Sequence, residues 1–216
     1  VTGVQTCALP ISPETLADGT PTTALTVILR TKGCHWWWSS GCTFCGYFND
    51  TRDDVTSEDL HSQWEKSLAR FDDFESMGMV KVYTSGSLLE DREIPVDFQE
   101  RVLRDCHEMG KELVVESRTE QLSKEKLQWA TSINPKFSVA IGLEAYDDEV
   151  LRFHVNKGFS IKSWDTFFTN ICFYSTAYFC WGFNSLFVCR KWLADNSKSG
   201  FKQSDFCQLF KVNAIF

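Results

Sequence analysis

The sequence predicts an α/β fold with a parallel β-sheet, because a short apolar strand followed by an amphipathic helix recurs four times. Polar residues follow each predicted strand, and in β/α folds the loops at the carboxyl ends of the strands open on one face. Three closely spaced cysteines follow the first of these strands. Together these observations indicate an enzyme whose site lies at one edge of the sheet.

The four predicted strands are short runs of apolar and β-branched residues. They cover residues 25–30, 79–84, 112–116 and 136–143. The Pro- and Thr-rich stretch before them, residues 12–24, is expected to form a lead-in loop.

Helices are predicted after the strands from capping residues and from apolar positions spaced three or four apart. Thr56 caps the first, whose stripe begins at Leu60, and Pro95 opens the second. Ser123 caps a short third helix, and Asp147 begins a fourth that ends near residue 156.

Composition limits the classes of function. A net charge of −7 does not suit a free-standing nucleic-acid-binding module, which needs basic clusters. Nine cysteines without a regular framework of spacings, and no secretory signal, indicate a reducing compartment and metal chemistry rather than disulfides. We therefore expect a cytoplasmic protein.

The two ends of the chain differ from its middle. Residues 1–11 (VTGVQTCALPI) resemble the translation of a sequencing-library adapter and lack the basic and apolar regions of a signal peptide. Residues 12–166 are expected to form the core. Residues 167–216 hold ten of the 18 phenylalanines, and we expect them to be a non-native tail. Polar residues interrupt the uncharged run 167–189, so a membrane span is not favoured.

The cysteines Cys34, Cys42 and Cys45 form a C-x7-C-x2-C array in one loop. Zinc normally takes a fourth protein ligand in a structural site, and His35 abuts Cys34, which is unfavourable geometry for chelating one ion. Three thiolates without an obvious fourth ligand favour a [4Fe-4S] cluster with one open iron. A zinc site remains the alternative at this point.

Several segments together resemble one family, the radical S-adenosylmethionine (SAM) proteins of archaeal archaeosine synthesis, whose core is similar to that of the Elongator catalytic subunit. The segments are RTKGC, GCTFCGYFND, YTSGS, VESRTEQ and IGLEAYDDEVLRFHVNKGF. The resemblance spans about residues 24–164. It implies a partial (β/α)6 barrel of the TIM type, truncated here to about four β/α units.

The resemblance also implies cofactors and the residues that bind them. Cys34, Cys42 and Cys45 would each ligate one iron of a [4Fe-4S] cluster, and the ring of Phe44 would pack near the adenine of SAM. The remaining implied SAM contacts are Ser85, Gly86, Ser87, Glu116, Arg118 and Glu144, the last of which would meet ribose or substrate. No catalytic residue is assigned.

The function implied by the resemblance is tRNA modification. The cluster would donate an electron to SAM, and the resulting 5′-deoxyadenosyl radical would act on a lysine adduct of a deazaguanine in tRNA to form archaeosine. A partner enzyme would add the lysine first. Because the final strands of such a barrel are missing, we expect cluster binding without turnover. The alternatives are a radical SAM enzyme with another substrate, and a zinc-binding structural or interaction module.

Overall fold

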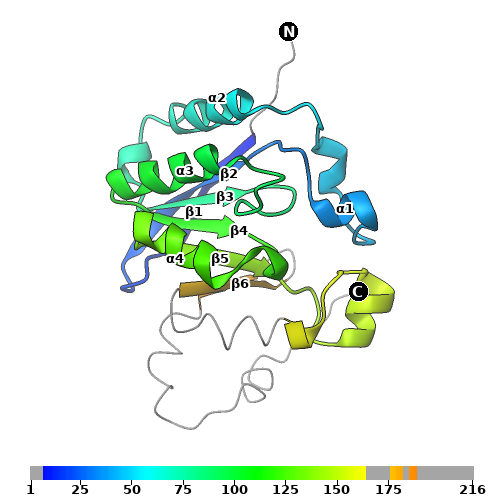
Figure 1. The fold of residues 1–216 in the computed structure, drawn as a ribbon. Helices are drawn as coiled ribbons and strands as arrows, with labels where there is room; N and C mark the ends of the chain where they lie inside the picture. The colour runs from blue at the N-terminus through cyan, green and yellow to red at the C-terminus, as the bar shows by residue number, and fades with distance from the viewer. Residues whose placement is uncertain (1–6, 164–175, 182–184, 189–216) are drawn as a thin grey trace.

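The computed structural model of the chain describes residues 7–163, 176–181 and 185–188 (Figure 1). One sheet of seven strands runs through these residues, and its strands lie in sequence order. The strands are β1 (Cys7–Thr15), β2 (Pro21–Ile28), β3 (Met79–Tyr83), β4 (Glu112–Glu116), β5 (Phe137–Gly142), β6 (Thr176–Trp181) and β7 (Ser185–Val188). Strands β2 to β6 pair in parallel, whereas β1 and β7 pair antiparallel with their neighbours. The predicted α/β class with a mostly parallel sheet is confirmed.

Three helices connect the parallel strands and cover one face of the sheet. They are α2 (Ser57–Leu68), α3 (Val96–Glu108) and α4 (Lys124–Ile133), which lie side by side in Figure 1. Alternate strand residues, such as Val80 and Val115, pack with Trp64, Phe98 and Leu127 of these helices in the main hydrophobic core. The other strand positions face the opposite side of the sheet, where a small second cluster joins Ala24, Met79, Val114 and Ala140.

The predicted start of α2 is confirmed in detail. The Thr56 hydroxyl accepts a hydrogen bond from the Asp59 backbone N–H, and the Asp59 carboxylate accepts one from the Thr56 N–H. This reciprocal capping box satisfies two backbone donors that the first turn of a helix leaves unpaired.

A partial (β/α)6 barrel stays a prediction. The sequential order of the parallel strands and the helices on one face are features that a barrel wall shares. Within the described residues, however, the sheet ends in the antiparallel strands β1 and β7 and does not close on itself.

The expectation of a lead-in loop over residues 12–24 is wrong. β1 extends to Thr15, and β2 begins at Pro21, four residues before the predicted strand. Proline lacks a backbone N–H, but Pro13 lies in an edge strand and Pro21 is the first residue of its strand, which are positions that tolerate proline. Neither proline therefore prevents strand formation, and the β-branched threonines of this stretch favour it.

Short helical segments lie at the end of the sheet where the parallel strands finish. They are α1 (His35–Ser39), 3₁₀ turns at Tyr47–Asp50 and Thr119–Gln121, and a π-helical turn at Val150–Val155; a further 3₁₀ turn, Phe74–Ser76, precedes β3. The helix predicted from Asp147 to near residue 156 is confirmed: residues 148–155 are helical, and the Asp147 carboxylate accepts hydrogen bonds from the Glu149 and Val150 N–H groups at its start. Asn156 ends it in the left-handed conformation, with φ of 51°.

The predictions about the two ends of the chain stay predictions. β1 includes residues 7–11 of the segment expected to derive from an adapter, and β6 and β7 lie within the segment expected to be a non-native tail. The rest of both segments falls outside the described residues. No helix in the described part of the chain is both long and apolar enough to cross a membrane.

Candidate functional site

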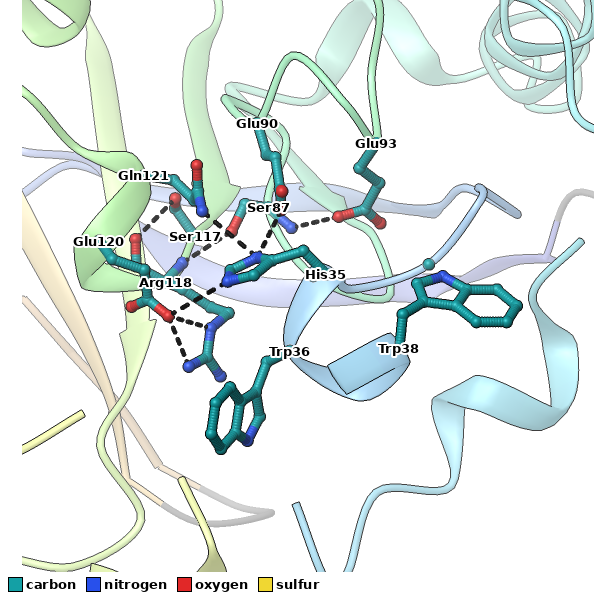
Figure 2. A network of polar contacts seen from close by, with 12 residues as sticks. His35, Trp36, Trp38, Ser87, Glu90, Glu93, Ser117, Arg118, Glu120 and Gln121 are labelled. Atoms are coloured by element: carbon teal, nitrogen blue, oxygen red, sulfur yellow. Dashed lines mark hydrogen bonds and ion pairs between the residues drawn. The ribbon is translucent and has the colours of Figure 1, made fainter. Parts of the chain in front are cut away.

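The candidate site lies at the carboxyl ends of β2 to β5, where four loops meet. The first is the cysteine loop, residues 31–50, after β2. The others are the turn after β3, residues 84–94, the turn after β4, residues 117–121, and the segment after β5, residues 143–159. Hydrogen bonds join each of these loops to at least one of the others, so residues far apart in the sequence form one polar network (Figure 2).

The three cysteines of the cysteine loop are free thiols. Cys34 is buried at the start of α1, and Cys42 and Cys45 are partly buried and joined by a hydrogen bond from the Cys45 N–H to the Cys42 carbonyl (3.2 Å). Burial raises the pKa of the Cys34 and Cys42 thiols, which the nearby cations Arg118 and Lys157 offset in part at Cys42. Both thiols are therefore protonated at neutral pH unless a metal binds them.

The three thiols do not lie close enough together to form a metal-binding site. Within the described ranges, no three or more His, Cys, Asp or Glu side chains come together closely enough to hold a metal ion. The donor chemistry nevertheless fits an iron–sulfur cluster, because three free cysteines share one loop and two cationic side chains stand beside Cys42. Binding would require the loop to bring the thiols together.

The cysteine loop is held against the segment after β5. The Asn156 side-chain amide donates hydrogen bonds to the Ser40 hydroxyl (2.8 Å) and the Gly41 carbonyl (2.6 Å). In the other direction, the Trp36 indole N–H donates to the Asn156 carbonyl (2.8 Å), and Thr43 donates to the Val155 carbonyl through its backbone N–H (3.0 Å). The residues between Cys34 and Cys42 thus form a short helix with defined contacts.

His35 is held by the turns after β3 and β4. Its Nδ1 lies 3.1 Å from a Glu90 carboxylate oxygen and 3.3 Å from the Gln121 side-chain nitrogen, and its Nε2 lies 3.8 Å from Glu120 (Figure 2). Both ring nitrogens therefore face carboxylates. This arrangement does not favour His35 as the fourth ligand of a zinc ion, the role that the zinc alternative would give it.

The turn Ser85–Ser87 packs directly on the cysteine loop. A Cβ atom placed on Gly86 would lie 2.8 Å from the Cα of Cys34 and 2.4 Å from Oε2 of Glu93, so only glycine allows this approach. The Ser87 side chain is fully buried and accepts a hydrogen bond from the Arg118 backbone N–H (2.9 Å). Gly86 therefore lies directly against the backbone of Cys34.

Arg118 links three of the loops. Its guanidinium pairs with Glu120 (2.6 Å) and donates to the Lys157 carbonyl (2.8 Å), and it lies 5.8 Å from the ring centre of Trp36. Only 7% of Arg118 is exposed. Arg118 is thus paired within its own turn, with Glu120, and tied to the segment after β5.

Glu116 and Glu144 lie near one another with Lys157. Burial raises the pKa of Glu116 to about 7; Lys157 opposes this shift, and the nearby carboxylates of Glu93 and Glu144 add to it. Lys157 pairs with Glu144 at 3.1 Å, and Glu144 has a φ of 70°, a conformation that non-glycine residues adopt rarely. Within the described part of the chain, no hydrogen-bond donor contacts the Glu116 carboxylate, so it has capacity for a ligand.

Phe44 stands at the exposed side of this group. It is 48% exposed, and the Lys157 ammonium lies 5.9 Å from its ring centre. The structure thus gathers the predicted residues Cys34, Cys42, Phe44, Gly86 and Arg118 around the carboxyl ends of the strands, together with the remaining predicted residues Cys45, Ser85, Ser87, Glu116 and Glu144.

Several residues of the network belong to no sequence motif, so the sequence alone does not mark them as functional. Glu90 and Glu93 are acids in a turn, and Glu120 lies among other charged residues, so nothing in the sequence separates them from solvated charges. Asn156 and Lys157 lie within the segment that carries the family resemblance, which is the one signal available for them.

Comparisons with known proteins relate the chain to archaeal proteins. No family model matches it. It is 36% identical over 152 residues to archaeosine synthase subunit beta of Methanosarcina acetivorans, an alignment of 68% of this chain and 44% of the relative. It is 32% identical over 146 residues to the protein of the same name in Thermococcus kodakarensis, covering 65% of this chain and 45% of the relative. An uncharacterized protein of Methanocaldococcus jannaschii is 32% identical over 143 residues, 62% of this chain and 39% of the relative. The chain thus spans less than half the length of these relatives.

Proposed function

We propose that this chain carries the cluster-binding and SAM-binding part of a radical SAM enzyme that modifies tRNA, in the step that forms archaeosine. The observation that carries the proposal is the placement of three free thiols in one loop that is docked on the carboxyl ends of the parallel strands. Two relatives named archaeosine synthase subunit beta support the tRNA-modifying role.

The proposed cluster ligands are Cys34, Cys42 and Cys45. When bound, the cluster would supply the electron that cleaves SAM and so starts radical chemistry on the substrate. The protein's part is binding and charge balance. Lys157 and Arg118 put positive charge beside Cys42, which favours its thiolate and offsets the negative charge of a thiolate-ligated cluster.

The proposed SAM contacts line the same edge of the sheet. The partly buried Glu116 has a carboxylate that can accept a hydrogen bond from an ammonium group, such as that of methionine, and such a contact would lower its raised pKa. Glu144 is held by Lys157 and suits ribose hydroxyls or the substrate. Phe44 offers an exposed aromatic ring for the adenine, and the Ser85–Ser87 turn offers backbone groups.

The proposed partners follow from the relatives. The name subunit beta implies a second subunit in those proteins, and we propose that this chain likewise works with a lysine-transferring partner enzyme and tRNA in the cytoplasm. Because the chain spans less than half of its relatives, the surface that binds tRNA is proposed to lie largely in the remaining part. A radical SAM enzyme with another substrate is the alternative within the same chemistry.

Metal analysis tests the proposal. The full chain is reconstituted anaerobically with iron and sulfide, beside Cys42→Ala and, as a matched control, Cys106→Ala, which removes a buried thiol of α3. We expect about four irons and four sulfides per chain in the wild type and the control, and loss of both in Cys42→Ala. Stoichiometric zinc without sulfide would overturn the proposal and favour a metal-stabilised binding module.

The substrate is tested separately. tRNA that carries the lysine adduct of the deazaguanine is incubated with the reconstituted protein, SAM and a reductant, and its nucleosides are analysed by mass spectrometry. A full-length relative serves as the positive control. Archaeosine formed by the reconstituted protein would support the assignment. Cluster-dependent SAM cleavage that leaves the tRNA unchanged, under conditions in which the relative forms archaeosine, would favour another substrate.

A further inference from the structure

A buried carboxylate lies between the cysteine loop and the Ser85–Ser87 turn. Glu93 is 2% exposed and belongs to the turn after β3, where the Glu90 N–H donates to the Ser87 carbonyl and the Ile94 N–H donates to the Glu90 carbonyl. Its Oε1 accepts a hydrogen bond from the Thr31 hydroxyl (2.5 Å), and its Oε2 accepts one from the Ser87 backbone N–H (2.7 Å; Figure 2). Each carboxylate oxygen thus holds a different loop.

The contacts of Glu93 lead to the first cysteine. Thr31, which is fully buried, accepts a hydrogen bond from the Gly33 N–H (3.1 Å) next to Cys34. On the other side, Gly86 packs against the Cα of Cys34. One carboxylate therefore connects the residues just before Cys34 with the turn that lies against Cys34.

We propose that Glu93 is a positioning residue that holds Cys34 against the Ser85–Ser87 turn. The role of Cys34 as a cluster ligand rests on the proposed function, but the positioning itself is a property of the metal-free protein. A buried carboxylate is unfavourable unless its oxygens are hydrogen-bonded, and here the Thr31 hydroxyl and the Ser87 N–H meet that need.

Two substitutions of Glu93 separate the hydrogen bonds from the charge. In Glu93→Ala both donors lose their acceptor, and the two loops lose their connection. In Glu93→Gln the amide oxygen can accept from the Ser87 N–H while the amide N–H donates to the Thr31 hydroxyl oxygen, so both connections are kept. Thr31→Val is a third variant that removes the hydroxyl, and with it both the bond to Glu93 and the bond from the Gly33 N–H, and changes the shape of the side chain little.

The readout is the alkylation rate of Cys34 in the metal-free full chain, followed for each cysteine by peptide mass spectrometry. Cys106, buried in α3, reports global opening in the same sample. We expect Glu93→Ala and Thr31→Val to raise the Cys34 rate about tenfold relative to Cys106, because a lost buried hydrogen bond shifts a local opening equilibrium by about that factor. Glu93→Gln should restore most of the protection.

A matched control removes a carboxylate elsewhere. Asp97→Ala breaks the hydrogen bond that the Ser57 hydroxyl donates to Asp97 in the helical layer, at the far end of α3 from Cys106. It should change the rates of Cys34 and Cys106 together and leave their ratio unchanged. An unchanged ratio in Glu93→Ala and Thr31→Val would overturn the positioning role. If Glu93→Ala does not fold, Thr31→Val decides the question.

Cluster content separates this inference from the proposed function. If the wild type takes up no iron and sulfide, the proposed function fails, but the alkylation ratios still decide the role of Glu93. If the wild type takes up a cluster, we expect its stoichiometry to fall in Glu93→Ala and to return in Glu93→Gln. Full cluster content in Glu93→Ala, with an unchanged Cys34 rate, would contradict the inference and leave the proposed function intact.

Discussion

Glu116 shows how position decides the chemistry of a residue. It is the last residue of β4 and faces away from the helices, toward Glu144 and Lys157. Burial raises its pKa to about 7, so it changes protonation near neutral pH. The strand and its alternation were predictable from the sequence, but the shifted pKa depends on loops that the sequence pattern does not place.

The raised pKa of Glu116 predicts a pH dependence of stability. Between its unfolded pKa of about 4.5 and its folded pKa of about 7, the folded state binds a proton that the unfolded chain releases. The contribution of Glu116 to the free energy of unfolding therefore falls as the pH rises through this range. We expect Glu116→Gln to be more stable than the wild type by about 1–2 kcal/mol at pH 8, and about equally stable at pH 4.5.

Urea denaturation at several pH values between 4.5 and 8 measures this difference. Glu65→Gln is the control, because its carboxylate is largely exposed and pairs only distantly with Arg101 (3.7 Å). The difference between Glu65→Gln and the wild type should be the same at every pH. Parallel curves for Glu116→Gln and the wild type would show that Glu116 ionises normally in the folded protein.

At the scale of elements, capping signals and apolar spacing predicted α2 and α3 well, because these helices depend on local hydrogen bonds and on one apolar face. β1 was missed because prolines suggested a loop, and only its place at the sheet edge explains why Pro13 is tolerated. The docking of the cysteine loop on the segment after β5 could also not be predicted from the sequence. It depends on the left-handed Asn156, which fits the loop only in the folded arrangement.

Asn156 allows a test of that docking. Asn156→Gly keeps the left-handed backbone and removes the two side-chain hydrogen bonds, whereas Asn156→Ala also adds conformational strain. We expect a loss of about 1 kcal/mol in unfolding free energy for Gly and about 2 kcal/mol for Ala. Hydrogen exchange of residues 34–45 should speed up in both variants. Unchanged exchange in Asn156→Gly would mean that other contacts hold the loop.

At the scale of the whole molecule, the sheet presents one face to the helices and carries charged side chains on the other. Lys81, in the middle of β3, is 6% exposed and pairs with Glu14 of β1 on that second face. This ion pair joins the edge strand to the sheet across many residues of sequence. It was not predicted, because residues 12–24 were expected to be a loop and Lys81 carries no motif.

Removing one partner of this buried ion pair should lower the free energy of unfolding more than replacing both partners. Glu14→Gln leaves the Lys81 ammonium buried without a counter-charge, and we expect a loss of about 2–4 kcal/mol in unfolding free energy. The double variant Glu14→Gln with Lys81→Met removes the charge as well and should recover most of that loss. Chemical denaturation of the two variants measures the difference. If Glu14→Gln and the double variant were both as stable as the wild type, Lys81 would reach solvent and β1 would contribute little to stability.

The site as a whole was predictable in its location and less so in its contacts. Parallel strands end at one edge, so the cysteines, the Ser85–Ser87 turn, Glu116, Arg118 and Glu144 were expected to meet there, and they do. The partners of these residues were not predictable. Arg118 pairs with Glu120, and Gly86 lies against Cys34, because the turns between elements set these contacts.

We propose that the cysteine loop holds a cluster that SAM contacts directly. The most direct measurement is the EPR spectrum of the reduced, reconstituted full chain with and without SAM, beside Cys45→Ala. We predict a reduced [4Fe-4S] signal in the wild type that changes shape when SAM is added, and no such signal in Cys45→Ala. A cluster signal that SAM leaves unchanged, or one that persists in Cys45→Ala, would contradict the claim.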